Sequence, residues 1–276
     1  MAPPPSSSRQ PWRPACSPAW CAASTSPPES LHAASQARQL AAAGELLLVA
    51  VADVAKAAHA GFQAAPVARQ IVDGAGHALA QACTTVHADR LRLARGRPET
   101  VLARTIASTD ATLVALGATL HGRVSEVVVG TVASAVLRSA PCSVLLARAP
   151  RSSERWPEQI VLGVDGSLHS ARASAVAVAL AHRFQAALRV VTATAGKPTD
   201  VERIHARHPD VEVDPRPPVD ALADAARTAD LVVVGSRGLH GWRALGSVSE
   251  RVAQRASCSV LVVRGAAPGA DGQPPG

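Results

Sequence analysis

Two glycine-containing segments in the second half of the chain have the residue types of an anion-binding site. The first segment, Gly163-Val-Asp-Gly-Ser167, follows an apolar run. The second, Gly235-Ser-Arg-Gly238, follows another apolar run and leads to Gly246-Ser247, which begins a stretch with helical spacing. Glycine has no Cβ, so its backbone N–H can approach a phosphate closely, and the first N–H groups of a helix have no partner within it. These segments therefore predict a phosphate-binding loop that ends at a helix start. The Ser247 hydroxyl could bind the anion there or simply cap the helix.

Asp165 is the charged residue of the first segment, and two roles are open to it. A carboxylate at this point could accept hydrogen bonds from the hydroxyls of a ribose. Asp165 and Ser167 could equally form the turn after the apolar run and cap the helix that follows. The spacing of the residues fits both interpretations.

The segments around these residues alternate between strand and helix patterns. In the second half, short apolar runs occupy 159–165, 188–194, 211–213, 231–235 and 259–263, and helical spacing runs through 168–183, 200–207, 219–228 and 248–255. The first half is similar, with a longer middle helix over about 66–83. Strands that are apolar throughout are typical of parallel sheets covered on both faces. Ligands bind such sheets beyond the carboxyl ends of the strands, which is where both glycine segments lie.

An internal repeat divides the chain into two halves. Ala111-Thr-Leu-Val-Ala-Leu-Gly117 resembles Ala229-Asp-Leu-Val-Val-Val-Gly235, and Pro141-Cys-Ser-Val-Leu-Leu-Ala-Arg148 resembles Ser257-Cys-Ser-Val-Leu-Val-Val-Arg264. Shorter matches pair Gly130-Thr131 with Gly246-Ser247 and Ser30-Leu-His32 with Ser167-Leu-His169. We therefore predict an α/β fold of two tandem three-layer domains, each with a mostly parallel five-stranded sheet.

The predicted domain boundaries follow the composition of the chain. They are a disordered Pro/Ser-rich tail at 1–24, a first domain at 25–149, a linker at 150–157, a second domain at 158–265 and a flexible tail at 266–276. Residues 20–24 make a poor strand, so the first domain is expected either to lack its first strand, leaving four, or to recruit 19–25 poorly.

Four segments together resemble the universal stress protein family: Gly163-Val-Asp-Gly-Ser, Val233-Val-Gly-Ser-Arg-Gly-Leu, Gly246-Ser-Val-Ser-Glu-Arg-Val and Cys258-Ser-Val-Leu-Val-Val-Arg. The resemblance covers nearly all of 157–265 and, more weakly, 29–148. It implies a five-stranded parallel sheet and, for one branch of the family, ATP binding through a Gly-x2-Gly-x9-Gly-[Ser/Thr] motif. The nucleotide-binding residues implied in this chain are Gly163, Asp165, Gly235, Ser236, Arg237, Gly238, Gly246, Ser247 and Val248. Gly163 and Asp165 would face the adenosine and the others the phosphates, with ATP bound with or without Mg²⁺.

The two halves depart from this motif in different ways. The second half has seven residues between Gly238 and Gly246, so its phosphate loop is short but keeps both ends. In the first half Leu120 replaces the second glycine, and we take Thr25 as the residue at the place of Asp165. A leucine side chain in the loop and a missing acceptor should both weaken binding. We therefore predict one working site, in the second half.

Composition excludes several other classes of protein. The net charge is +7, but only two basic residues are lysines, and the chain has no Tyr and two Phe, so stacking surfaces for nucleic acid are lacking. No run approaches 18 apolar residues, and the first 25 residues contain no apolar signal segment, so no membrane association is expected and the cytoplasm is the expected location. The five cysteines form no metal-binding pattern, and no Walker A or Gly-x-Ser-x-Gly motif occurs.

The sequence thus predicts a regulatory stress-response protein that binds adenine nucleotide and is not an enzyme. Catalytic and metal-binding residues are expected to be absent. The resemblance implies association through the last strands, and we expect 143–146 and 259–263 to pair within the chain, which buries two otherwise open edges, with a further homodimer of such tandems. Two alternatives stay open, a nucleotide-free dimerisation scaffold and a weak ATPase.

Overall fold

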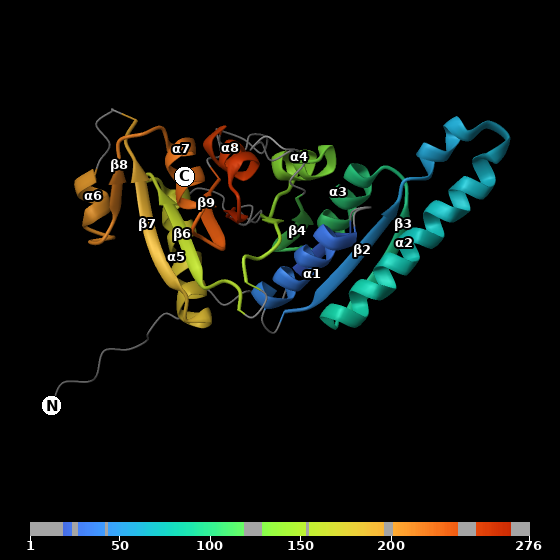
Figure 1. Ribbon diagram of the computed structural model, residues 1–276, viewed down its shortest axis with the longest axis horizontal. Coiled ribbons are helices and arrows are strands. Elements are labelled where there is room, and N and C mark those ends of the chain that lie inside the picture. The colour runs from blue at the N-terminus through green and yellow to red at the C-terminus, as the bar shows by residue number, and fades with distance from the viewer. Residues whose placement is uncertain are drawn as a thin grey trace, which may run out of the picture.

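The computed structural model describes residues 19–23, 27–41, 44–118, 129–152, 155–195, 201–236 and 247–265. Their ten strands form one sheet, in the order β3-β2-β1-β4-β5-β10-β9-β6-β7-β8 (Figure 1). The first five strands in this order belong to the first half of the chain, and the last five are the corresponding strands of the second half in reverse order. The predicted α/β fold of two tandem domains is therefore confirmed.

The first half contains β1 (Ala19–Ala23), α1 (Pro27–Ala41), β2 (Leu46–Ala52), the 3-10 segment η1 (Val54–Gln63), α2 (Ala64–Val86), β3 (Arg90–Arg95), α3 (Pro98–Ser108), β4 (Leu113–Gly117), α4 (Thr131–Ser139) and β5 (Ser143–Ala147). The second half contains β6 (Gln159–Val164), α5 (Leu168–Phe184), β7 (Ala187–Ala193), α6 (Val201–His205), β8 (Glu212–Asp214), α7 (Pro218–Ala225), β9 (Leu231–Gly235), α8 (Ser247–Arg255) and β10 (Ser259–Val263). The bounds expected for β9 and β10 agree with these, and the others differ by a few residues at most.

β1 corrects the predicted start of the first domain. It lies between β2 and β4 and is parallel to both, with Ala19 opposite Leu46 on one side and Leu113 on the other. The part of the sheet formed by the first half therefore has five strands. The domain boundary expected between 24 and 25 is wrong, because β1 of the first domain begins at Ala19. A strand with few β-branched residues can form here because two neighbours supply its backbone hydrogen bonds.

Helices cover both faces of the sheet. On one face, α3, α4, α7 and α8 bury side chains such as Leu102, Leu137, Leu222 and Val252. On the other, α1, α2, α5 and α6 contribute residues such as Ala37, Leu79, Ala173 and Ile204. Every residue of β2 is buried, as expected of a parallel strand covered on both sides. Each of these two core clusters contains residues of both halves, so the hydrophobic core on each face of the sheet is continuous between the two domains.

The halves join through the antiparallel pair β5–β10, in which Val144 lies opposite Val262. The predicted pairing of the final strands within the chain is therefore confirmed. It covers two strand edges that would otherwise be open to other chains. Among the described strands, β3 and β8 remain as the outer edges of the sheet.

Two arginines, one from each half, make hydrogen bonds to the other half across the β5–β10 pair, which we call the seam. Arg148 is 1% exposed and donates to the carbonyls of Ala253 and Cys258, at 2.6 and 2.7 Å, at the end of α8. Arg264 donates in the same way to the carbonyls of Leu137 and Ala140 at the end of α4. Each half therefore caps the last helix of the other with a cation, which also complements the negative end of that helix.

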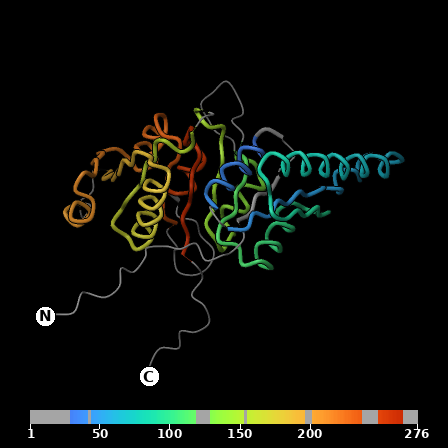
Figure 2. The backbone as a smooth tube through the Cα atoms, turned by 90° about the horizontal axis from the view of Figure 1, so that it is seen from below, coloured from blue at the N-terminus to red at the C-terminus, as the bar shows by residue number. Residues whose placement is uncertain are grey.

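The halves differ most in the segment between their second and third strands. In the first half this segment is η1 and the long helix α2, which extend outward from the sheet (Figure 2). In the second half the described part of this segment, 194–195 and 201–211, contains one short helix, α6. Among the described residues, this segment therefore has less helix in the second half than in the first. The candidate site lies in the second half, at the carboxyl ends of its strands.

Candidate functional site

The predicted site residues that the structure describes lie at the carboxyl ends of β6 and β9. These strands are neighbours, with Gly163 opposite Val234. From β6 the chain continues to β7 on one side, whereas β9 is followed by β10 on the other. The loops after β6 and β9 therefore diverge at this point, the arrangement in which open α/β sheets bind ligands.

The turn after β6 shows the structural role of Asp165. Its Oδ1 accepts a hydrogen bond from the Ser167 N–H at 3.0 Å, and the Ser167 Oγ accepts one from the Ser170 N–H at 3.2 Å. Gly166 between them has a φ of +75°, which favours glycine. Asp165 and Ser167 thus make the turn and the cap of α5, as one of the two interpretations expected. Asp165 is half-buried and lies at the edge of the sheet, so a role toward a ribose stays a proposal.

The end of β9 is held closely against α5 and α8. A Cβ on Gly235 would lie 2.5 Å from the carbonyl oxygen of His169, so the strand can approach the start of α5 only with glycine here. The Gly235 carbonyl accepts a hydrogen bond from the Ser249 Oγ at 2.8 Å. Ser236 is 8% exposed, and its N–H donates to the Val263 carbonyl at 3.0 Å. These contacts place the first turn of α8 at the same sheet edge as the Asp165 turn.

The remaining predicted residues are described only in part. Ser247 is the first residue of α8, and Val248 is exposed in its first turn. Arg237, Gly238 and Gly246 lie outside the described residues. Gly163 has a packing role, because a Cβ there would lie 2.9 Å from the Leu222 Cδ1 of α7.

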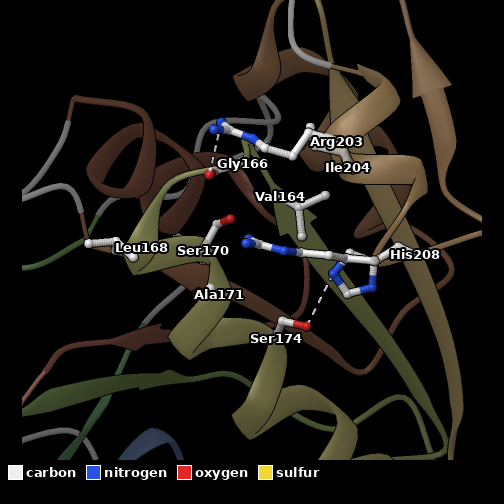
Figure 3. Close-up of a pocket in the computed structure, with 10 residues that line it drawn as sticks. Val164, Gly166, Leu168, Ser170, Ala171, Ser174, Arg203, Ile204 and His208 are labelled. Carbon is white, nitrogen blue, oxygen red and sulfur yellow. Dashed lines mark hydrogen bonds between the residues drawn. The ribbon is translucent and has the colours of Figure 1, made fainter.

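Two arginines and a histidine near this edge were not predicted. Arg203, Arg207 and His208 line a cavity between α5 and α6, next to the Gly166 turn (Figure 3). Arg203 donates to the Gly166 carbonyl at 3.3 Å, and the His208 Nε2 lies 3.2 Å from the Ser174 Oγ. The sequence signal was the spacing of the arginines, four residues apart in a helical segment. This spacing predicts that both arginines lie on one face of the helix, but it does not predict which element packs against that face.

The corresponding edge of the first half shows that the short repeat match was misaligned. A Cβ on Gly117 would lie 2.6 Å from the carbonyl oxygen of Glu29, just as one on Gly235 would approach His169. Glu29, and not His32, therefore occupies the place of His169, and the match of Ser30 with Ser167 is three residues out of register.

The strand register also corrects the counterpart of Asp165. Ala22 pairs with Leu116 as Gly163 pairs with Val234, so Ala22 takes the place of Gly163. Two residues further along the chain, the counterpart of Asp165 is then Ser24 and not Thr25; both lie outside the described residues. The first half lacks a carboxylate at this position by either alignment, so the correction leaves the predicted difference between the halves in place.

Two tandem α/β units joined through antiparallel final strands, with a glycine-bounded loop at each carboxyl edge, define the class of this protein. The family model described as "Universal stress protein family" matches residues 22–148 and 195–264. The chain belongs to the universal stress protein family, as its motifs indicated.

Individual relatives agree with this assignment. A universal stress protein of Mycolicibacterium smegmatis is 33% identical over 237 residues, which cover 70% of this chain and 77% of that protein. One of Mycobacterium tuberculosis is 32% identical over 186 residues, or 57% of this chain, and the match spans 63% of the relative's length. The crystal structure of a universal stress protein from Archaeoglobus fulgidus has the same fold, with a TM-score of 0.62 and 15% identity over 90% of this chain and 98% of that one.

Proposed function

We propose that this universal stress protein is a regulatory module that binds one adenine nucleotide, ATP in the first instance, at the carboxyl edge of β6 and β9. The observation that carries the proposal is the Ser249–Gly235 hydrogen bond of 2.8 Å. It holds the first turn of α8 at the edge where the Asp165 turn also lies. The N–H groups and positive dipole end of α8 favour phosphate, and the carboxylate of Asp165 favours ribose hydroxyls.

The loop from Gly235 to Ser247 would hold the phosphates through backbone N–H groups. Gly235 and Ser236 form its described beginning, and Ser247 its described end. Ser236 is already anchored to β10 through Val263, so the loop starts from a rigid point. This loop is two residues shorter than the family motif. We expect the shortening to change the affinity for ATP more than the place where ATP binds.

The residues at this edge support binding better than catalysis. Asp165 is engaged in the turn, which hinders it from acting as a general base for an attacking water. In the part of the chain that the structure describes, no three His, Cys, Asp or Glu side chains are grouped to hold a metal ion, so any Mg²⁺ would arrive with the nucleotide. Binding alone can shift a conformational or assembly equilibrium, which is sufficient for a stress-response switch.

Localisation and assembly complete the proposal. No helix of the described segments is long and apolar enough to cross a membrane. We place the protein in the cytoplasm, with nucleotide occupancy controlling a partner or a homodimer. Because β5 and β10 pair with each other, a homodimer that extends the sheet would have to use the edge of β3 or β8.

Calorimetric titration with ATP tests the proposal, with matched variants in the two halves. Gly246→Glu puts a carboxylate at the predicted phosphate position and should weaken ATP binding by about a hundredfold or more, equivalent to about 2.8 kcal/mol. Gly130→Glu makes the same change before α4, where a Cβ meets nothing within 4 Å, and should leave binding unchanged. Phosphate release from ATP that disappears in Asp165→Ala would favour the weak ATPase. Absence of ATP binding by the unmodified chain would leave the scaffold function.

A further inference from the structure

A cavity lies beside the proposed nucleotide site, on the opposite face of the sheet from α8. The cavity has a volume of about 250 Å³ and opens between the first turns of α5, the Gly166 turn and α6 (Figure 3). Val164 and Ile204, both buried, contribute apolar side chains to its lining. A ligand here would therefore meet an apolar surface as well as the polar groups around it.

The charged side chains that line this cavity are all cationic. The turn after α6 continues the helix through the His208 N–H to Ile204 carbonyl bond of 2.8 Å, so Arg203 and Arg207 lie one turn apart on the same side. The Arg207 N–H donates to the Ile204 carbonyl at 3.0 Å, and within the described segments the Arg207 guanidinium has no hydrogen bond or ion pair. Burial lowers the pKa of His208, and the positive charge of the neighbouring Arg207 lowers it further.

The start of α5 adds to this positive field. Its first turn contains no acidic residue, although the N-terminus of a helix of 17 residues favours an anion. The equivalent helix of the first half, α1, has Glu29 in its first turn, with an Oε2 that is buried without a hydrogen-bond partner. The first half thus has a carboxylate within the helix itself, whereas in the second half the carboxylate of Asp165 lies in the turn before α5.

We propose that this cavity is a binding site for a phosphate group, held by Arg203, Arg207 and His208, with the apolar part of a small phosphate ester against Val164 and Ile204. Guanidinium groups bind phosphate through paired N–H donors, and Ser174, within hydrogen-bond distance of His208, can orient the imidazole. The phosphate could belong to a separate small metabolite or to a nucleotide that reaches across the Gly166 turn. The experiments below distinguish these two sources.

The first experiment follows the histidines of the unmodified full chain by NMR during pH titration, with and without inorganic phosphate. An anion beside His208 stabilises its protonated form, so phosphate should raise the pKa of His208 by about one unit, a tenfold preference of phosphate for the protonated site. The ring signals of His59, which is exposed on η1, are the control and should not respond to phosphate. An unchanged pKa of His208 in saturating phosphate would overturn the proposal.

The second experiment uses calorimetry with inorganic phosphate and with glycerol phosphate as probes. The double variant Arg203→Gln, Arg207→Gln should bind both at least tenfold more weakly, whereas Arg104→Gln, an exposed arginine on α3, should bind as the unmodified chain does. Equal binding by the double variant and the control would overturn the proposal. If the double variant loses folding, as seen by circular dichroism, the NMR titration decides alone.

Competition with ATP identifies the source of the phosphate. If ATP and glycerol phosphate bind together, the cavity takes a separate metabolite; if each displaces the other, it takes the phosphate of the nucleotide. Both results support a phosphate site, and neither depends on the Gly246 loop. Failure of ATP to bind while phosphate still shifts His208 would overturn the proposed function and leave this inference standing.

Discussion

The two halves of the chain have the same backbone packing at the carboxyl edge of the sheet but different charged side chains beside the helices that begin there. Gly117 and Gly235 each let a strand end approach the first turn of a helix, at Glu29 and His169 respectively. The first helix of the first half begins with an acidic residue, whereas the second half places Arg203, Arg207 and His208 beside the equivalent helix. The fold thus depends on the glycines, and the ligand preference depends on the side chains around them.

The hydrogen bonds that follow each glycine support the same conclusion. The Ala118 N–H donates to the Ala147 carbonyl at 2.9 Å, as the Ser236 N–H donates to the Val263 carbonyl at 3.0 Å. Asp53, directly after β2, has an Oδ1 that is buried without a hydrogen-bond partner, a second carboxylate near the edge of the first half. A nucleotide phosphate would be repelled from such an edge, which agrees with one working site per chain.

The largest expected effect tests the shared packing. Gly117→Val and Gly235→Val each force a side chain into the backbone of the facing helix, so each should lower the free energy of unfolding by more than about 3 kcal/mol. Urea denaturation measures this. Gly74→Ala is the control: its Cβ meets nothing within 4 Å inside α2, so it should stabilise by about 0.5–1 kcal/mol. If valine is tolerated at only one of the two positions, the result would contradict the claim that Gly117 and Gly235 have the same packing role.

The seam arginines give the next largest effect. Arg148→Met leaves two buried carbonyls at the end of α8 without donors and should cost about 2–3 kcal/mol of stability. Arg264→Met does the same at the end of α4, but Arg264 is less buried, so about 1 kcal/mol is expected. Thermal unfolding of the two variants, compared at one pH, checks the order. A greater loss for Arg264→Met would contradict the account of the seam.

An alkaline pH dependence follows from the two equivalent cysteines. Burial raises the pKa of Cys142 to about 11 and of Cys258 to about 12, from an ordinary value of 9.0. Above pH 9 the unfolded chain loses these protons while the folded chain keeps them, so stability falls as the pH rises. Arg148, whose pKa burial lowers to about 10, contributes in the opposite sense only above that pH.

Between pH 9 and 10 the two cysteines should therefore reduce the free energy of unfolding by about 1–2 kcal/mol. The chain has no tyrosine, whose titration would otherwise overlap this range. The double variant Cys142→Ala, Cys258→Ala should show a shallower decline in denaturant titrations across this range. An identical decline in both proteins would show that the thiols are not the source.

The smallest effect separates the two roles of Asp165. Asp165→Asn keeps an oxygen for the Ser167 N–H, so stability should change by less than about 0.5 kcal/mol. The lost charge should still weaken ATP binding by about fivefold, or about 1 kcal/mol, if the residue accepts from the ribose. Unchanged ATP affinity in Asp165→Asn would limit this residue to the turn.

The sequence predicted the elements with strong local patterns. β9 and β10 are uninterrupted apolar runs, and their predicted bounds match the structure. The pairing of β5 with β10 was implied by the family resemblance, and it covers the open edge that each half would otherwise have. β1 was less certain because Ala-Trp-Cys-Ala-Ala has little strand propensity of its own, and its place depends on β2 and β4.

What the sequence could not provide was the relation between elements. A three-residue match at Ser30 carries no information about helix register, which is set where Gly117 and Gly235 meet the helix backbones. Arg203 and Arg207 were seen only as part of a polar helix, because nothing in a helical period shows that α6 faces the start of α5. The charge difference between the two edges therefore emerges only from the structure.

The most direct test of the central claim is the number of nucleotides that each chain carries. The purified protein is denatured, and the released nucleotide is measured by chromatography against the protein concentration, before and after saturation with ATP. We expect about one adenine nucleotide per chain, lost in Gly246→Glu and kept in Gly130→Glu. Two per chain would contradict the difference between the halves, and none, even after incubation with ATP, would contradict the nucleotide site itself.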